Sequence, residues 1–275
     1  MTALSSAGSS AQRVAHNDKI RGVARLGLAG HGALYVLLGV LALVLAFGAR
    51  KGETDQKGAF EKLAANTAGW VLLLVIAIGL TAYGLWQLSQ AALGVSGVED
   101  GHAAKERLKC AAPGVVYCAL ALSAFTVVVN GRSSSSQSKQ QQEWTATVMK
   151  QTGGRWLVGL IGIVVAIVGI VLIVRAAKKS FEKYFPMASM SPTARRLTET
   201  LGLVGSIARG VIVGMVGVLF LTAAIQFDPK KARGVDGALR ALRDNPVGPW
   251  LLGAVALGLI MFGLFGFCEA RWRKL

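Results

Sequence analysis

The chain has 275 residues, of which 53% are hydrophobic and 16% are charged, and its mean hydropathy is +0.52. Water-soluble domains of this length are rarely so apolar, so the composition excludes an ordinary soluble protein. The formal net charge of +16 does not indicate nucleic-acid binding, because the lysines and arginines gather at the ends of apolar segments, where they would contact anionic lipid head groups.

Residues 1–22 are polar and rich in small side chains, so we expect a flexible N-terminal arm and not a secretory signal. Six apolar segments follow it. Each is close to the roughly 20 residues that a helix needs to cross about 30 Å of hydrocarbon. The sequence therefore predicts an all-α, polytopic membrane protein. The six transmembrane helices are expected at 26–48, 69–92, 111–130, 156–175, 203–227 and 250–268.

The connections on one side of the predicted membrane differ in character. "GAFEKLAAN" (58–66) and "DGALRALRDNP" (236–246) place apolar residues at helical spacing, and each predicts a short interfacial helix. Asp236 suits the N-cap of the second one. The third connection, "NGRSSSSQSKQQQEW" (130–144), is of low complexity, and we expect it to be mobile and to hold no catalytic centre.

The distribution of basic residues predicts the orientation. Of the 30 lysines and arginines, 17 fall on the side of the membrane that holds both chain termini, and 13 fall on the other side. Because Lys and Arg are enriched in cytoplasmic loops, this excess favours cytoplasmic N- and C-termini.

The sequence contains an internal repeat. Residues 58–91 and 237–270 align without a gap, and 154–176 aligns more loosely with the same pattern. The segments "AGHGALY", "CAAPGVVY" and "IARGVIV" repeat as well. These matches predict three parallel helical-hairpin repeats in a pseudo-threefold arrangement. The expected organisation is an arm at 1–22, hairpin repeats at 23–98, 103–181 and 201–275, and a linker at 182–200.

Many of the aligned positions are glycines. Membrane helices associate by close backbone approach at faces of small residues, so we expect a tightly packed bundle. The glycines predicted to pack helices together are Gly32, Gly114, Gly210, Gly214, Gly79, Gly84, Gly258 and Gly263.

These features resemble a bacterial family of membrane proteins, the domain-of-unknown-function family numbered 1206. The resemblance covers about residues 20–273 and depends on the three hairpins, on "GLVGSIARG" and on "GLTAYGLW". It implies a multi-pass protein of the bacterial plasma (inner) membrane, and it implies no catalytic residue. His31 departs from the family pattern, which has an arginine at this position, as Arg209 does in the third repeat. Pro113 occupies the position in the second repeat.

Polar residues inside membrane helices are functional candidates, because hydrocarbon penalises them. His31 and Arg209 occupy equivalent repeat positions, and so do Gln90, Arg175 and Glu269. Around a threefold axis, these five residues would form a polar ring near the cytoplasmic end. Such a ring suits an anionic lipid head group, a phosphate or a carboxylate. The alternative is purely structural and weighs more: Arg209 pairs with Glu269, and His31 pairs with Gln90.

The sequence offers no catalytic constellation, no cluster of metal ligands and no cofactor motif. We therefore expect a non-enzymatic accessory or structural protein that binds anionic lipid, a membrane-protein partner or a second copy of itself. The alternative is a small channel or transporter with a path along the pseudo-threefold axis. The middles of the predicted helices have few polar residues, which favours the accessory function.

Overall fold

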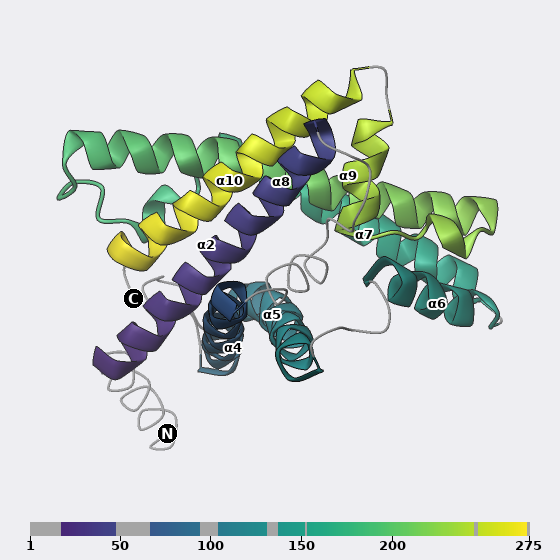
Figure 1. The fold of residues 1–275 in the computed structure, drawn as a ribbon, viewed down its shortest axis with the longest axis horizontal. Coiled ribbons are helices and arrows are strands. Elements are labelled where there is room, and N and C mark those ends of the chain that lie inside the picture. The colour runs from purple at the N-terminus through teal and green to yellow at the C-terminus, as the bar shows by residue number, and fades with distance from the viewer. Residues whose placement is uncertain are drawn as a thin grey trace.

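The computed structural model describes residues 18–47, 67–93, 104–130, 137–151, 153–244 and 247–273, and these residues form eight α-helices and two short 3-10 helices (Figure 1). Residues 1–17 of the predicted N-terminal arm and the predicted helix at 58–66 lie outside them, whereas residues 18–22, expected to belong to the flexible arm, form the first turn of helix α2. The α-helices are α2 (Asp18–Phe47), α4 (Thr67–Leu93), α5 (Ala104–Asn130), α6 (Gln137–Met149), α7 (Gly154–Ala177), α8 (Pro192–Gln226), α9 (Val235–Arg243) and α10 (Gly248–Trp272). The 3-10 helices are η1 (Glu182–Tyr184) and η2 (Pro229–Lys231).

Five of these helices are long and apolar enough to cross a membrane: α2, α4, α7, α8 and α10. In α5 the apolar stretch is shorter, Pro113–Val129, because the helix begins with the charged sequence "AKERLK". The sequence predicted six spans, and the structure thus supports five by length and composition. The fold is all-α, and its apolar helices are those of a multi-pass membrane protein.

Three helix pairs join successive repeats: α4 packs on α5, α7 on α8, and α10 on α2. Two sets of aligned glycines form these interfaces: Gly84, Gly169 and Gly263 in one set, and Gly32, Gly114 and Gly210 in the other. At each interface, one glycine of the first set meets one glycine of the second. A Cβ atom built on the glycine of the first helix would lie closer than ordinary van der Waals contact to the carbonyl oxygen of the glycine on the second helix. The pairs and distances are Gly84 to Gly114 at 3.3 Å, Gly169 to Gly210 at 2.9 Å and Gly263 to Gly32 at 2.6 Å. The three repeats therefore use the same backbone contact.

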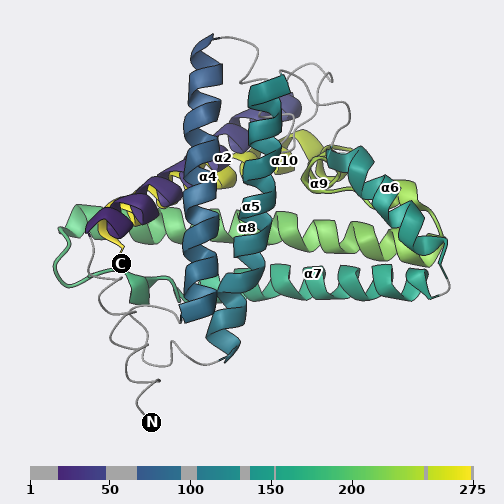
Figure 2. The ribbon, with the colours of Figure 1, turned by 90° about the horizontal axis from the view of Figure 1, so that it is seen from below.

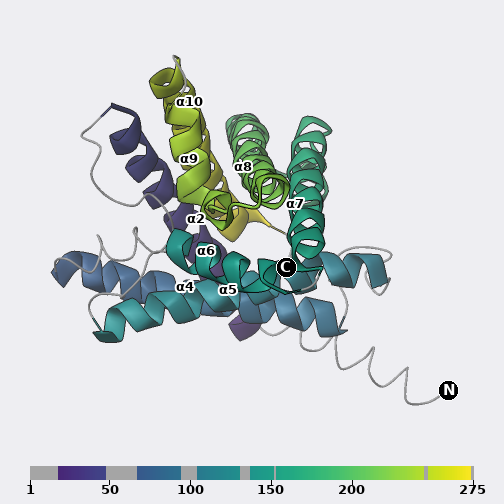
Figure 3. The ribbon, with the colours of Figure 1, turned by 90° about the vertical axis from the view of Figure 1, so that its right-hand side faces the viewer.

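Contacts within a repeat are not equivalent in the three cases. In the first repeat α2 packs on α4, and in the third α8 packs on α10. In the second repeat α5 and α7 do not share an extended interface. Figures 2 and 3 show that α4 and α5 cross α7 and α8 at a steep angle. The regular bundle predicted from the repeats is therefore opened at its second hairpin.

The remaining predicted glycines also lie at helix contacts. A Cβ built on Gly79 would lie 2.9 Å from the Cα of Gly30, and Gly258 approaches the Cβ of Ala208. These contacts occupy equivalent positions in the first and third repeats. Gly214 faces Gly169, with more room: its built Cβ would lie 4.0 Å from the Gly169 Cα.

Two connections differ from the predictions. The low-complexity segment was expected to be mobile throughout, but residues 137–149 form α6, in which Thr145 is buried. Helix α8 begins at Pro192, inside the expected linker at 182–200. The Ser191 side chain caps this helix by accepting a hydrogen bond from the Ala194 N–H, and Pro192 suits the first helical position.

The short helix predicted before the last membrane helix is confirmed as α9, while its position at the membrane interface stays a prediction. Its leucine Leu239 is fully buried, against a core that includes Leu252 and Ile212. The N-cap prediction was wrong, because Gly234 occupies that position. Asp236 lies in the first turn instead, where its carboxylate accepts a hydrogen bond from Arg240 at 2.8 Å.

The unequal room at the α7–α8 contact predicts unequal effects of two Gly→Ala substitutions. Gly169→Ala would place a methyl group 2.5 Å from the Gly214 Cα, so we expect a loss of about 1–3 kcal/mol of stability from overpacking. Gly214→Ala makes only an ordinary van der Waals contact, 4.0 Å from the Gly169 Cα, and gains helix propensity, so we expect no loss of stability. Thermal unfolding of both variants in detergent tests this. Equal destabilisation by both would contradict the packing described.

Candidate functional site

His31 lies in the middle of a cluster of aromatic rings. It is 2% exposed, and four rings surround it, from Tyr35 on α2, Tyr83 on α4, Tyr117 on α5 and Phe262 on α10. Tyr83 stacks on the imidazole at a centroid distance of 5.1 Å, and the other three rings meet it edge to face. At His31, helix α2 is therefore in contact with side chains of three other helices, α4, α5 and α10.

One nitrogen of the imidazole has a hydrogen-bond partner. A bond of 2.6 Å joins His31 Nε2 and the hydroxyl of Tyr117. The other nitrogen, Nδ1, is buried and has no partner among the described residues. An unpaired polar atom in an apolar interior costs free energy unless something else satisfies it.

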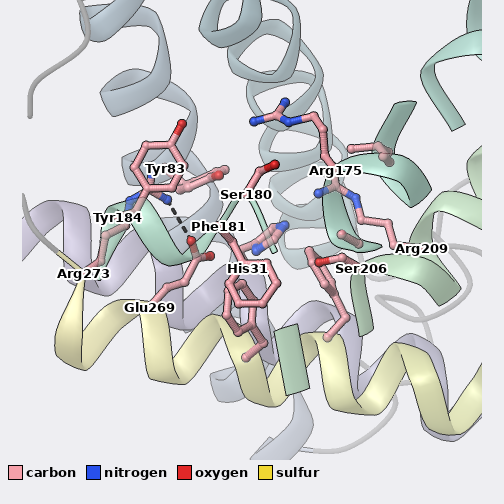
Figure 4. A pocket seen from close by; sticks show the side chains of 14 residues that line it. His31, Tyr83, Arg175, Ser180, Phe181, Tyr184, Ser206, Arg209, Glu269 and Arg273 are labelled. Atoms are coloured by element: carbon pink, nitrogen blue, oxygen red, sulfur yellow. Dashed lines mark hydrogen bonds and ion pairs between the residues drawn. The ribbon is translucent and has the colours of Figure 1, made fainter. Parts of the chain in front are cut away.

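A cavity of about 200 Å³ opens beside this cluster (Figure 4). His31 and Tyr83 line it together with residues of α7, α8, α10 and the segment that joins α7 to α8. Three guanidinium groups face one carboxylate there, so the lining has an excess of positive charge. These residues are Arg175 on α7, Arg209 on α8, and Arg273 and Glu269 on α10.

The one carboxylate of the lining is already paired. Glu269 accepts a hydrogen bond of 2.9 Å from Arg273, one turn further along the same helix. Arg209 has no such partner: its Nε is buried and forms no hydrogen bond within the described part of the chain. Its guanidinium lies over the rings of Phe262, at 5.0 Å, and Tyr35, at 5.7 Å. Aromatic faces attract the guanidinium charge but leave its N–H donors available.

The structure brings together four of the five residues of the predicted polar ring. His31, Arg209, Arg175 and Glu269 all line the cavity. Gln90 is not on the lining; its side-chain oxygen accepts a weak hydrogen bond from Cys110. The second repeat contributes no polar group at the position of Pro113, so the positions do not form a closed threefold ring.

The structural alternative for these residues was wrong in both of its pairs. Glu269 pairs with Arg273 and not with Arg209, and His31 bonds to Tyr117 and not to Gln90. The first difference has a simple cause, because residues four apart on a helix meet with little loss of side-chain freedom. That pairing leaves Arg209 without a counter-ion at hydrogen-bond distance.

The tyrosines of the site were missed, although the repeat contains a signal for them. Tyr35 and Tyr117 end the aligned segments "AGHGALY" and "CAAPGVVY", and Tyr83 aligns with Phe262. All four rings around His31 thus follow the repeat register. No group of three or more potential metal ligands occurs among the described residues.

The fold and the repeats define a class: a helical membrane protein built from three copies of one two-helix unit. The chain belongs to the family described as Domain of Unknown Function (DUF1206), whose model matches it three times, at 26–94, 108–179 and 204–273. It is similar to "Uncharacterized protein YxxB" of Bacillus subtilis (strain 168), with 32% identity over 257 residues, 93% of this chain and 92% of the relative. No solved structure matches it.

The His31–Tyr117 hydrogen bond predicts a measurable difference between two Tyr→Phe variants. Tyr117→Phe leaves both imidazole nitrogens unpaired, so we expect a loss of about 1–3 kcal/mol of stability. Tyr83→Phe keeps the ring that stacks on His31 and removes only its hydroxyl, so a change within about 0.5 kcal/mol is expected. Unfolding of the two variants in the same detergent makes the comparison, and a larger loss for Tyr83→Phe would refute it.

Proposed function

We propose that this chain is a non-enzymatic accessory protein of the bacterial plasma membrane that binds the anionic head group of a phospholipid in the cavity beside His31. The single observation behind this proposal is the pair of unpartnered buried nitrogens, His31 Nδ1 and Arg209 Nε, on the lining of a cavity with an excess of guanidinium groups. In the proposed tautomer the Tyr117 hydroxyl donates to His31 Nε2, so that Nδ1 carries the proton and both nitrogens are donors. Phosphate oxygens satisfy such donors well, because arginine N–H groups match their geometry and charge.

The proposal includes a membrane topology. In this proposal six helices, including α5, span the bilayer around one axis, and they lie more nearly parallel there than α4 and α5 lie to α7 and α8 in the structure. Both termini lie in the cytoplasm, as the excess of basic residues on their side favours. Arg175 and Glu269 then lie near the cytoplasmic ends of α7 and α10, and Arg209, in the middle of the longer helix α8, lines the same cavity. This places the cavity toward the anionic head groups of the cytoplasmic leaflet.

The alternative, a channel or transporter along the axis, fits the cavity less well. A conduit needs polar side chains through the middle of the helices. Beside the cavity, four aromatic rings fill the space around His31. The core next to them contains fully buried aliphatic residues, among them Leu34, Leu38 and Leu80. This packing supports a site that holds a head group over one that passes solutes.

Neutralising Arg209 tests the head-group site. Arg209→Gln removes the charge and the unpaired Nε donor, so we expect anionic phospholipid to bind at least about tenfold more weakly, the equivalent of one charge-assisted hydrogen bond. Arg196→Gln is the matched control, because Arg196 is exposed on the same helix and away from the cavity. Native mass spectrometry with phosphatidylglycerol measures both variants. Unchanged binding by Arg209→Gln would refute the site.

The topology is tested by reporter fusions after Leu275. A cytoplasmic C-terminus predicts a fluorescent GFP fusion and an inactive alkaline phosphatase fusion, because GFP folds in the cytoplasm and the phosphatase needs the disulfides that form outside it. The reverse pattern would place the basic side of the protein outside the cell and overturn the orientation.

A further inference from the structure

The second repeat leaves one face of α7 without a helix partner. In the first and third repeats, the positions equivalent to Val164 and Val168 are Gly79 and Tyr83, and Gly258 and Phe262, and all four of these residues are buried. Val164 is 52% exposed and Val168 is 46% exposed. The face that closes the other two hairpins is therefore open in the second.

This open face is a continuous apolar stripe. Its residues follow one another at intervals of four and three, so they line one side of a straight helix. They are Leu157, Ile161, Val164, Val168 and Val171, and each is more than 40% exposed. At 1.5 Å per residue the stripe is about 21 Å long, enough for an acyl chain that extends across the roughly 15 Å of one leaflet.

The stripe leads directly into the cavity. The next residue in its register is Arg175, four positions after Val171, and Leu172 follows Val168 at the same interval. Both Arg175 and Leu172 line the cavity. A single side of α7 therefore changes from apolar to cationic at the point where it reaches His31 and Arg209.

From this continuity we propose that the acyl chain of the bound phospholipid lies along this open face of α7, which we call the groove. The inference rests on the proposed function, since the head group occupies the cavity beside Arg209. The phosphate chemistry alone would also suit free phosphate or glycerol phosphate. The apolar stripe that ends at the cationic cavity matches an amphiphile, with its charge at one end and its hydrocarbon along α7.

The first experiment fills the groove without touching the cavity. Val168→Trp places a large ring on the stripe, so we expect dioleoyl phosphatidylglycerol to bind at least fivefold more weakly, while binding of glycerol 1-phosphate stays within twofold of the wild type. Ile170→Trp is the matched control. Ile170 is also exposed, but it is two residues after Val168 and therefore lies about 200° away around the helix axis, on another side of α7. Its lipid affinity should stay within twofold.

The second experiment needs no substitution. Wild-type protein is irradiated with phosphatidylglycerol that carries a photoreactive diazirine in its acyl chain, and the adducts are located by mass spectrometry. Adducts should concentrate on the stripe between Leu157 and Val171 and avoid Ile163 and Ile170. An even distribution round α7 would show ordinary bilayer contact and overturn the groove.

The outcomes separate the two proposals. If Val168→Trp and Ile170→Trp weaken lipid binding equally, or if the lipid binds no better than glycerol 1-phosphate, the groove is wrong while the head-group site stands. If the wild type binds neither the lipid nor glycerol 1-phosphate, the head-group site itself is wrong. Loss of lipid binding in Val168→Trp alone, with stripe-specific adducts, supports both.

Discussion

Close backbone contact at glycine is the constraint on which the arrangement of the repeats depends. In a membrane the hydrophobic effect does not drive helices together, so association relies on van der Waals contact between surfaces that approach closely. At all three interfaces between repeats, a glycine at one repeat position (84, 169 or 263) lies against a glycine at a second repeat position (114, 210 or 32) in the next repeat. The chain therefore repeats a packing unit, and the remaining side chains are placed by it. The aromatic cluster around His31 forms where these interfaces converge.

The second repeat shows what happens when this unit is incomplete. Its contact with each neighbouring repeat uses glycines, but its internal face on α7 has Val164 where the other repeats have Gly79 and Gly258. A β-branched side chain keeps two helix backbones apart, so α5 and α7 have no close contact to form. The cavity is asymmetric as well: the first repeat contributes His31 and Tyr83, the second contributes Arg175 at the end of an apolar stripe, and the third contributes Arg209, Glu269 and Arg273.

For most ends of the membrane helices, the sequence predicted the terminal residue to within a few positions. It could do so because hydrocarbon thickness and hydropathy determine where the apolar segments begin and end. It also placed His31, Arg209, Arg175 and Glu269 near one another, because repeat register determines which residues share a level. It could not predict which charges pair. Glu269 had two arginines within reach, and the choice of Arg273 depends on side-chain geometry that no spacing rule contains. The opening between α5 and α7 likewise depends on the whole set of interfaces.

The choice of partner at Glu269 has a consequence for binding. Had Glu269 paired with Arg209, the cavity would be satisfied internally, and an anion would have to displace a carboxylate to enter. With Glu269 held by Arg273, the Arg209 guanidinium lies over the rings of Phe262 and Tyr35 with its Nε unpaired, and His31 Nδ1 is unpaired on the same cavity lining. Unpaired buried donors cost free energy in the empty protein, and a bound anion offsets that cost by satisfying them. Burial without a partner therefore makes these two groups unfavourable in the empty protein and favourable for binding an anion. For this reason we place the head group in the cavity and not at the exposed basic ends of the helices.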